Sequence, residues 1–128
     1  METKPTESEL EILQILWEKG EQTVREVNET LNRHRRVGYT TTLKIMQIMA
    51  EKGFLSRDTG SRTHVYHTNV PMEVIREGMT DHLVETVFRG SRTGLVLQAL
   101  GNHRITSQEL EEIKDLLQTL EKTDGRTD

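Results

Sequence analysis

The sequence has no cysteine, only two prolines and few aromatic residues (one Trp, two Tyr and two Phe). The absence of cysteine excludes disulfides, thiolate metal ligands and a cysteine nucleophile. No stretch approaches the roughly 20 consecutive apolar residues of a membrane-spanning helix. The first residues also lack the basic segment and apolar core of a secretory signal. We therefore expect a cytoplasmic protein with no direct membrane association.

Charge is distributed unevenly along the chain, although the net charge of −4 is modest. Between Leu31 and His67, seven Lys and Arg residues stand against two acids, which leaves +5. After Val70, seven cations stand against eleven acids, which leaves −4. Because local charge matters more than its sum, the basic middle of the chain indicates a surface that attracts nucleic acid.

Two capping boxes mark the starts of two short helices. Thr6 is followed three residues later by Glu9, and Thr23 is followed by Glu26. In such a pair, each side chain can bond to the backbone N–H group of the other residue. Apolar residues recur at helical spacing after each box, and Gly20 ends the first helix.

Residues 39–53 form a third helix in this prediction, and the rest of the chain is organised around it. Its apolar side carries Leu43, Ile45, Met46, Met49 and Ala50. Its opposite side carries Thr40, Lys44, Gln47 and Glu51. Short hydroxyls and cations at the start of a helix suit a DNA groove, because they can bond to phosphates and base edges. Taken alone, the stretch also fits a solvated amphipathic helix capped by a threonine.

After Gly53 the pattern changes to short strands. Residues 54–57 and 63–67 contain strand-forming side chains, and the segment between them is rich in turn formers, which predicts a β-hairpin. Three short helices followed by a hairpin within about 70 residues is the order of a winged helix-turn-helix, whose third helix enters the major groove. We therefore predict a mostly α fold with a small β-hairpin, in which residues 1–70 are a winged-helix DNA-binding domain.

Eleven residues are candidates for DNA binding, because they are polar or basic and lie on the third helix, the loop before it or the hairpin. They are Arg33, Arg35, Arg36, Tyr39, Thr40, Thr41, Lys44, Gln47, Arg57, Arg62 and His64. The loop arginines suit phosphate, because a cation cluster on a loop has no fixed geometry. Thr40 fits an N-cap as well as a base contact, Gln47 fits an adenine edge as well as solvent, and Thr42 falls toward the apolar side.

Residues 71–128 form a helical dimerisation domain in this prediction, because Pro71 suits the first turn of a new helix. Helices are expected over residues 72–88 and 94–100 and after a third capping box at Thr106 and Glu109. With so few aromatics, three such helices would bury their apolar stripes poorly alone, so a two-fold homodimer is expected. The candidate dimerisation residues are Ile75, Met79, Leu83, Val87, Leu95, Leu97, Leu110, Ile113 and Leu117.

Nothing in the sequence indicates catalysis or metal binding. The five histidines are dispersed, and His64 and His67 would lie on opposite faces of a strand. No nucleophile motif such as Gly-x-Ser-x-Gly is present. We expect no catalytic residue, no metal and no cofactor, and hence no enzyme.

Seven segments, taken in order, resemble the penicillinase-repressor family. They are TESELEIL with the following Trp17, VREV from Val24, YTTTL from Tyr39, EKG at residues 51–53, VY at residues 65–66, FRGS from Phe88 and SQELEEI from Ser107. The resemblance covers nearly the whole chain. It implies a bacterial homodimeric repressor of the β-lactamase and antibiotic-response type, whose winged helices bind a palindromic double-stranded DNA operator.

The resemblance leaves the switching mechanism open. In the antibiotic-sensing branch of the family, a membrane sensor-protease system triggers cleavage in the dimerisation domain, at positions that match Gln98 and Ala99. Well-known members have an Asn-Phe pair there, so a ligand-switched repressor without proteolysis is an alternative. The cysteine pair of the copper-responsive branch is absent, which excludes that thiolate switch. A winged-helix module that binds protein instead of DNA is a further alternative, and its third helix and hairpin would be neutral or apolar.

Overall fold

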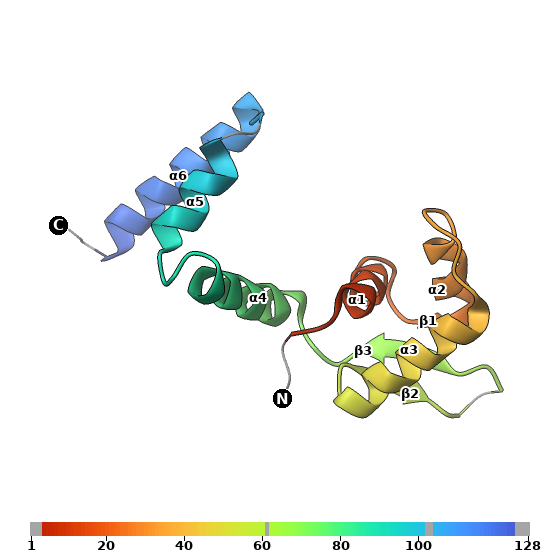
Figure 1. The fold of residues 1–128 in the computed structure, drawn as a ribbon. Helices are drawn as coiled ribbons and strands as arrows, with labels where there is room; N and C mark the ends of the chain where they lie inside the picture. The colour runs from red at the N-terminus through yellow and green to blue at the C-terminus, as the bar shows by residue number, and fades with distance from the viewer. Residues whose placement is uncertain (1–3, 61, 102–103, 125–128) are drawn as a thin grey trace. The chain divides into compact units, whose positions relative to one another are not determined.

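The computed structural model describes residues 4–60, 62–101 and 104–124. They form, in order, α1 (Glu7–Lys19), β1 (Gln22–Thr23), α2 (Val24–Leu31), α3 (Tyr39–Lys52), β2 (Leu55–Asp58), β3 (Val65–Thr68), α4 (Met72–Thr86), α5 (Arg92–Gly101) and α6 (Ser107–Asp124) (Figure 1). Three helices followed by a hairpin confirm the predicted winged helix-turn-helix, and the fold is mostly α with one small sheet.

The chain divides into two compact units, Met1–Leu83 and Val84–Asp128. The first contains α1 to β3 and most of α4, and the second contains α5 and α6. From the sequence, we predicted a functional boundary at Pro71, between a DNA-binding domain (residues 1–70) and a dimerisation domain (residues 71–128). A packing unit is not a functional domain, so that boundary stays a prediction.

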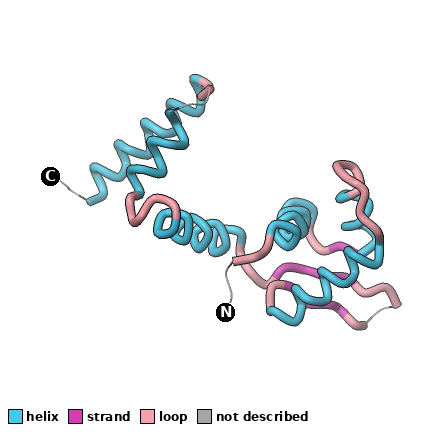
Figure 2. Tube along the Cα trace, viewed as in Figure 1, coloured by secondary structure: helices cyan, strands magenta, loops and turns pink. Residues whose placement is uncertain are grey.

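The sheet has three antiparallel strands in the order β1-β3-β2 (Figure 2). The hairpin of β2 and β3, called the wing from here on, was predicted, whereas β1 was not. In β1, Gln22 pairs with Tyr66 and Thr23 pairs with Val65. A strand of two residues has no periodicity to detect, yet it joins the start of α2 directly to the wing.

The core of the first unit lies where α1, α2 and α3 meet the sheet. Its fully buried side chains are Ile12, Leu13, Val27, Met46, Met49, Phe54, Tyr66 and Ile75. Trp17 lies at the margin of this core, where its indole Nε1 donates to the Val70 carbonyl at 3.0 Å. Since Ile75 comes from α4, the first turns of α4 are part of the same packed unit as the winged helix.

All three predicted capping boxes are confirmed. Thr6 caps α1 with Glu9, and Thr23 caps α2 with Glu26. Thr106 Oγ1 accepts from the Glu109 N–H at 3.0 Å, and Glu109 Oε1 accepts from the Thr106 N–H at 3.0 Å. These local bonds fix where each helix starts, independently of tertiary packing.

The turn after α4 sets the end of that helix and the start of α5. Arg89 and Gly90 adopt positive φ angles of 51° and 88°, and the Gly90 N–H donates to the Val84 carbonyl at 2.8 Å. Ser91 Oγ then accepts from the Gly94 N–H at 2.8 Å and caps α5. These bonds move both helix ends slightly from their predicted positions, while the helices themselves are confirmed.

Glu9 joins the start of α1 to the end of α3. Its Oε1 accepts from the Thr6 N–H at 2.9 Å, and its Oε2 accepts from Lys52 Nζ at 2.8 Å. Burial of the Glu9 carboxyl by itself would raise its pKa, but the hydrogen bonds from Lys52 and Thr6 and the charge of Lys52 outweigh it, so the pKa lies below its ordinary value. The ion pair therefore holds α3 against α1.

We expect Glu9→Gln to lower the free energy of unfolding at pH 7 by about 1–3 kcal/mol, because the nearly buried Glu9 side chain loses the charge that pairs with Lys52. The folded pKa of Glu9 lies below its ordinary value of 4.5, so its stabilising contribution is complete above that value and is lost as the pH falls through the folded pKa. Urea unfolding at a series of pH values measures both effects.

The matched control is Glu29→Gln, which removes an exposed carboxylate from α2. It should leave the free energy of unfolding within about 0.5 kcal/mol of wild type. If Glu9→Gln were as stable as wild type at pH 7, with the same acid dependence, Glu9 would not have this role.

Candidate nucleic-acid interface

The buried side of α3 determines which of its residues face solvent. Met46 and Met49 are fully buried, and Leu43 and Ile45 pack against the same core. The exposed side carries Thr40, Thr41, Lys44, Gln47 and Glu51. The predicted amphipathic pattern is confirmed, and the exposed side of α3 is almost entirely polar.

Thr42 anchors the first turn of α3 inside the protein. Although polar, it is fully buried, and its Oγ1 accepts from Asn28 Nδ2 at 2.8 Å. Asn28 Nδ2 also donates to the Val37 carbonyl at 3.0 Å. Because a buried hydroxyl without a partner costs free energy, this bond favours a single placement of α3 against α2. Thr42 has a structural place, as its position on the apolar side predicted.

The N-cap of α3 is Gly38, and no side chain caps this helix. The alternative that Thr40 is the N-cap is therefore wrong, because Thr40 lies within the helix and Gly38 takes the extended backbone that a cap requires. Tyr39, Thr40 and Thr41 thus open the helix without a side-chain acceptor for their N–H groups. Such a helix start favours anions, since its N–H donors and its dipole both point at them.

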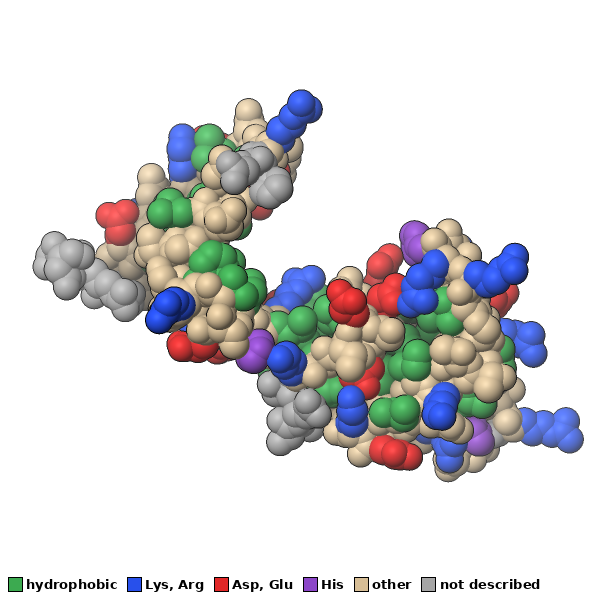
Figure 3. Space-filling model, in the orientation of Figure 1, with side chains coloured by type: hydrophobic (Ala, Val, Ile, Leu, Met, Phe, Trp, Pro, Cys, Tyr) green, Lys and Arg blue, Asp and Glu red, His purple; other side chains and the backbone are tan. Residues whose placement is uncertain are grey.

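A hollow of about 500 Å³ separates the start of α3 from the wing, and we call it the wing hollow. Five of the predicted DNA-binding residues line it. They are Tyr39, Gln47, Arg57, Arg62 and His64. Figure 3 shows Lys and Arg side chains along the margin of the first unit that carries the α2–α3 loop and the wing. The fold therefore gathers residues that are far apart in the sequence around one basic concavity.

The loop before α3 is closed by Asn32. Its side chain accepts from the Val37 N–H at 3.1 Å and donates to the Val37 carbonyl at 2.9 Å, while the Val37 side chain is buried. The arginines of the closed loop are all exposed. Arg35 forms an ion pair with Glu11 of α1, and Arg36 is exposed.

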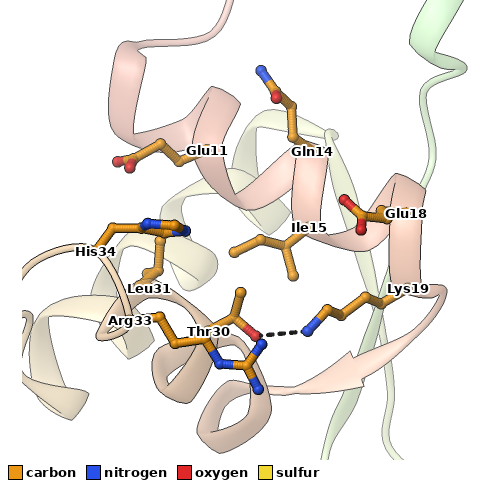
Figure 4. A pocket seen from close by; sticks show the side chains of 9 residues that line it. All are labelled: Glu11, Gln14, Ile15, Glu18, Lys19, Thr30, Leu31, Arg33 and His34. Carbon is orange, nitrogen blue, oxygen red and sulfur yellow. Dashed lines mark hydrogen bonds between the residues drawn. The ribbon is translucent and has the colours of Figure 1, made fainter.

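Arg33 lies near α1 and away from the wing hollow. It lines a second hollow, of about 330 Å³, between α1 and the end of α2 (Figure 4). Glu11, Glu18 and Lys19 line the same hollow, and Lys19 Nζ bonds to Thr30 Oγ1 at 3.2 Å. Neither Arg33 nor Arg35 lines the wing hollow. The structure thus separates these two predicted DNA-binding residues from the five that it brings together.

Arg25 belongs to the wing hollow and was missed from the sequence. Its guanidinium carbon lies 6.0 Å from the centroid of the Tyr39 ring, a cation–π distance. Arg25 lies before the basic segment of residues 31–67, so the charge distribution along the chain did not single it out. A usable signal was its place between Val24 and Val27, which both face the core and so turn Arg25 outward.

The predicted dimerisation residues have different surroundings. Ile75 is fully buried and Met79 packs against the core of the first unit, so Ile75 has no surface left for a second subunit. Leu83, Val87, Leu97, Leu110 and Leu117 are exposed, and Leu95 and Ile113 are half-buried. Gln98 and Ala99 are exposed on α5.

In the described parts of the chain, no helix is long and apolar enough to cross a membrane. No three histidine or acidic side chains come close enough together there to hold a metal ion.

A third helix with an exposed polar side, next to a basic wing, is typical of DNA-binding winged-helix regulators. The family model described as penicillinase repressor matches residues 5–119. The chain therefore belongs to the penicillinase repressor family, which confirms the resemblance inferred from its motifs. Members of this family are transcriptional repressors and not enzymes.

The chain is similar to the transcriptional regulator BlaI of Mycobacterium tuberculosis (strain ATCC 25618 / H37Rv), with 28% identity over 96% of this chain and 89% of the relative. It is also similar to the penicillinase repressor of Staphylococcus aureus, with 20% identity over 90% of this chain and 91% of the relative. Among solved structures, a mutant MarR from E. coli complexed with operator DNA has a TM-score of 0.51 and 17% identity, covering 91% of this chain and 75% of that one. This last likeness shows a shared fold.

Proposed function

We propose that the chain acts in the bacterial cytoplasm as a homodimeric repressor that binds a palindromic double-stranded DNA operator. Residues 1–70 supply the DNA-binding domain and residues 71–128 supply most of the dimer contact. The observation that carries the proposal is the exposed polar side of α3, which lies next to a hollow lined by three arginines, Arg25, Arg57 and Arg62.

In this arrangement α3 enters the major groove and the wing lies along the adjacent backbone. Thr41 and Lys44 are one turn apart on the exposed side, at the start of the helix, where recognition helices contact base edges. Gln47 follows one turn later and can bond to an adenine through its amide. Arg57 and Arg62 of the wing region then meet phosphates, which position the protein without reading sequence.

A winged-helix module for protein binding is less well supported. Such a module would present a neutral or apolar third helix and wing. Here the only large hydrophobic residues exposed on α3 are Tyr39 and Ile48, and the wing hollow is basic. This surface favours a polyanion over a protein partner.

The second unit supports a homodimer. None of the described side chains of α5 or α6 is buried, and Leu97 is 65% exposed. Among the described residues of this unit, the exposed large apolar side chains are Val87, Val96, Leu97, Leu110, Leu116, Leu117 and Leu120. So many exposed apolar side chains on one small unit call for a partner surface. A second copy supplies it by two-fold symmetry, and the two copies of α3 then reach adjacent half-sites of a palindrome.

We propose cleavage between Gln98 and Ala99 as the release step. A cut there would separate α6, with its exposed leucines, from the winged helix, and the protein would lose the avidity of two joined half-sites. A ligand switch without proteolysis is the second candidate. It is favoured by a pocket of about 320 Å³ within the first unit, lined by Pro5, Met79 and Leu83 among others.

Selection from random-sequence duplexes should enrich an inverted repeat, and binding to that repeat should weaken as salt is added. For each neutralised phosphate, the slope of log affinity against log salt concentration should be about −0.9.

Lys44→Ala should weaken operator binding by about 1–3 kcal/mol if Lys44 bonds to a base, and less if it meets only phosphate. Lys114→Ala, which removes an exposed cation of α6, is the matched control. Salt-independent binding, or no enrichment of any sequence, would contradict DNA recognition by α3.

Leu97→Glu and Leu117→Glu should each convert the dimer to monomers at micromolar concentration. A carboxylate buried in an apolar interface costs about 3 kcal/mol, or about 100-fold in the dissociation constant. Sedimentation velocity measures the change, with Thr93→Glu on the exposed surface of α5 as the control. A wild-type chain that sediments as a monomer at micromolar concentration would rule out the homodimer.

Mass spectrometry of the chain recovered from induced cells tests the release step. We expect fragments that end at Gln98 and begin at Ala99. A chain recovered intact after derepression excludes proteolysis and leaves the ligand switch.

A further inference from the structure

Arg25 is held at a fixed place on the edge of the wing hollow. It is the second residue of α2, whose start is set by the Thr23 capping box, with the Glu26 carboxylate 2.9 Å from the Thr23 N–H. Thr23 also belongs to β1, which pairs with β3 of the wing. The backbone at Arg25 is therefore tied both to a capped helix and to the sheet, so its side chain leaves a rigid base.

The Tyr39 ring orients the guanidinium of Arg25. The two groups form the cation–π pair described above, at 6.0 Å. The face of an aromatic ring attracts a guanidinium without using its N–H donors, which stay free to bond elsewhere. Over the described part of the chain, no carboxylate pairs with Arg25. Its donors are therefore oriented and available to an anion.

The other groups around the hollow point to the same kind of ligand. Arg57, Arg62 and His64 line it, and no acidic residue is among the described residues that do so. Several cations around one concavity raise the local concentration of anions. A hollow between a recognition helix and a wing is where the DNA backbone would pass, so the anion expected there is a backbone phosphate.

Phosphate is favoured over a base because of the helix that carries Arg25. Arg25 is on α2, the first helix of the helix-turn-helix, which crosses the backbone while α3 enters the groove. A guanidinium presents two parallel N–H groups that match two phosphate oxygens. We propose that Arg25 binds one backbone phosphate in the wing hollow through such a bidentate contact, and that Tyr39 is its positioning residue. This inference rests on the proposed function of DNA binding.

The test compares full-length variants on two probes, a duplex selected by the wild-type chain and a random-sequence duplex of equal length. Arg25→Gln should lose about 10- to 100-fold in affinity on both probes alike, because a charge-assisted contact that reads no sequence is removed. The slope of log affinity against log salt should fall by about 0.9 per subunit, or about 1.8 for a dimer. Arg76→Gln, which removes an exposed cation of α4, is the matched control and should change neither quantity.

Conservative variants test the positioning role. Arg25→Lys should keep the salt slope but lose affinity, because an ammonium keeps the charge without the planar fork. Tyr39→Leu should weaken binding, and Tyr39→Phe, which keeps the ring, should restore most of that loss. Adding Tyr39→Leu to Arg25→Gln should cost little more than Arg25→Gln alone, since the ring would have no guanidinium left to orient. Thermal unfolding of each variant is the control for folding, and each midpoint temperature should match that of wild type.

Three results would overturn the inference. An Arg25→Gln variant with wild-type affinity and salt slope would exclude a phosphate contact. Loss of preference at one base pair, with unchanged binding to the random duplex, would make Arg25 a base reader. Equal losses in Tyr39→Phe and Tyr39→Leu would exclude positioning by the ring. If the wild-type chain selects no duplex at all, it is the proposed function that fails.

Discussion

The hydrogen bond from the Asn28 amide to the buried Thr42 hydroxyl determines which side of α3 faces solvent. It places the first turn of α3 against α2, while Asn32 closes the loop between these helices through its two bonds to Val37. At the other end of α3, the ion pair of Lys52 with Glu9 joins the helix to α1. With both ends bonded and the Met46 side of the helix packed into the core, α3 cannot turn about its axis without breaking a buried polar contact.

The two units of the chain use their apolar residues differently. In the first unit a closed core supports polar surfaces that suit a polyanion. In the second unit the described helices leave most of their leucines and valines exposed. The proposed homodimer would use both properties, because joining two winged helices multiplies affinity for DNA without new contacts. Ile75, early in α4, belongs to the first group, because its apolar side chain is fully buried in the core of the first unit.

Features encoded locally could be predicted from the sequence. A capping box needs only four residues, and the two sides of α3 follow from its helical period, so these helices were predicted. The wing was predicted because strand-forming residues flank a segment rich in turn formers. Features that depend on distant residues could not be predicted. The pairing of β1 with β3 joins residues over 40 positions apart, and Arg35 turned toward Glu11 of α1 because of a tertiary ion pair. Arg25 became visible only when folding brought it beside Tyr39.

Hydrogen exchange of the full chain, measured with and without a duplex that it selects, tests the central claim most directly. We predict that DNA slows exchange at the first turn of α3, around Thr40 and Thr41, and in the wing, while α1 is unchanged. These amides have no side-chain cap and would gain phosphate partners or be shielded in the groove. Protection confined to α1 and the hollow beside Arg33, with α3 and the wing unaffected, would show that DNA does not bind on the exposed side of α3.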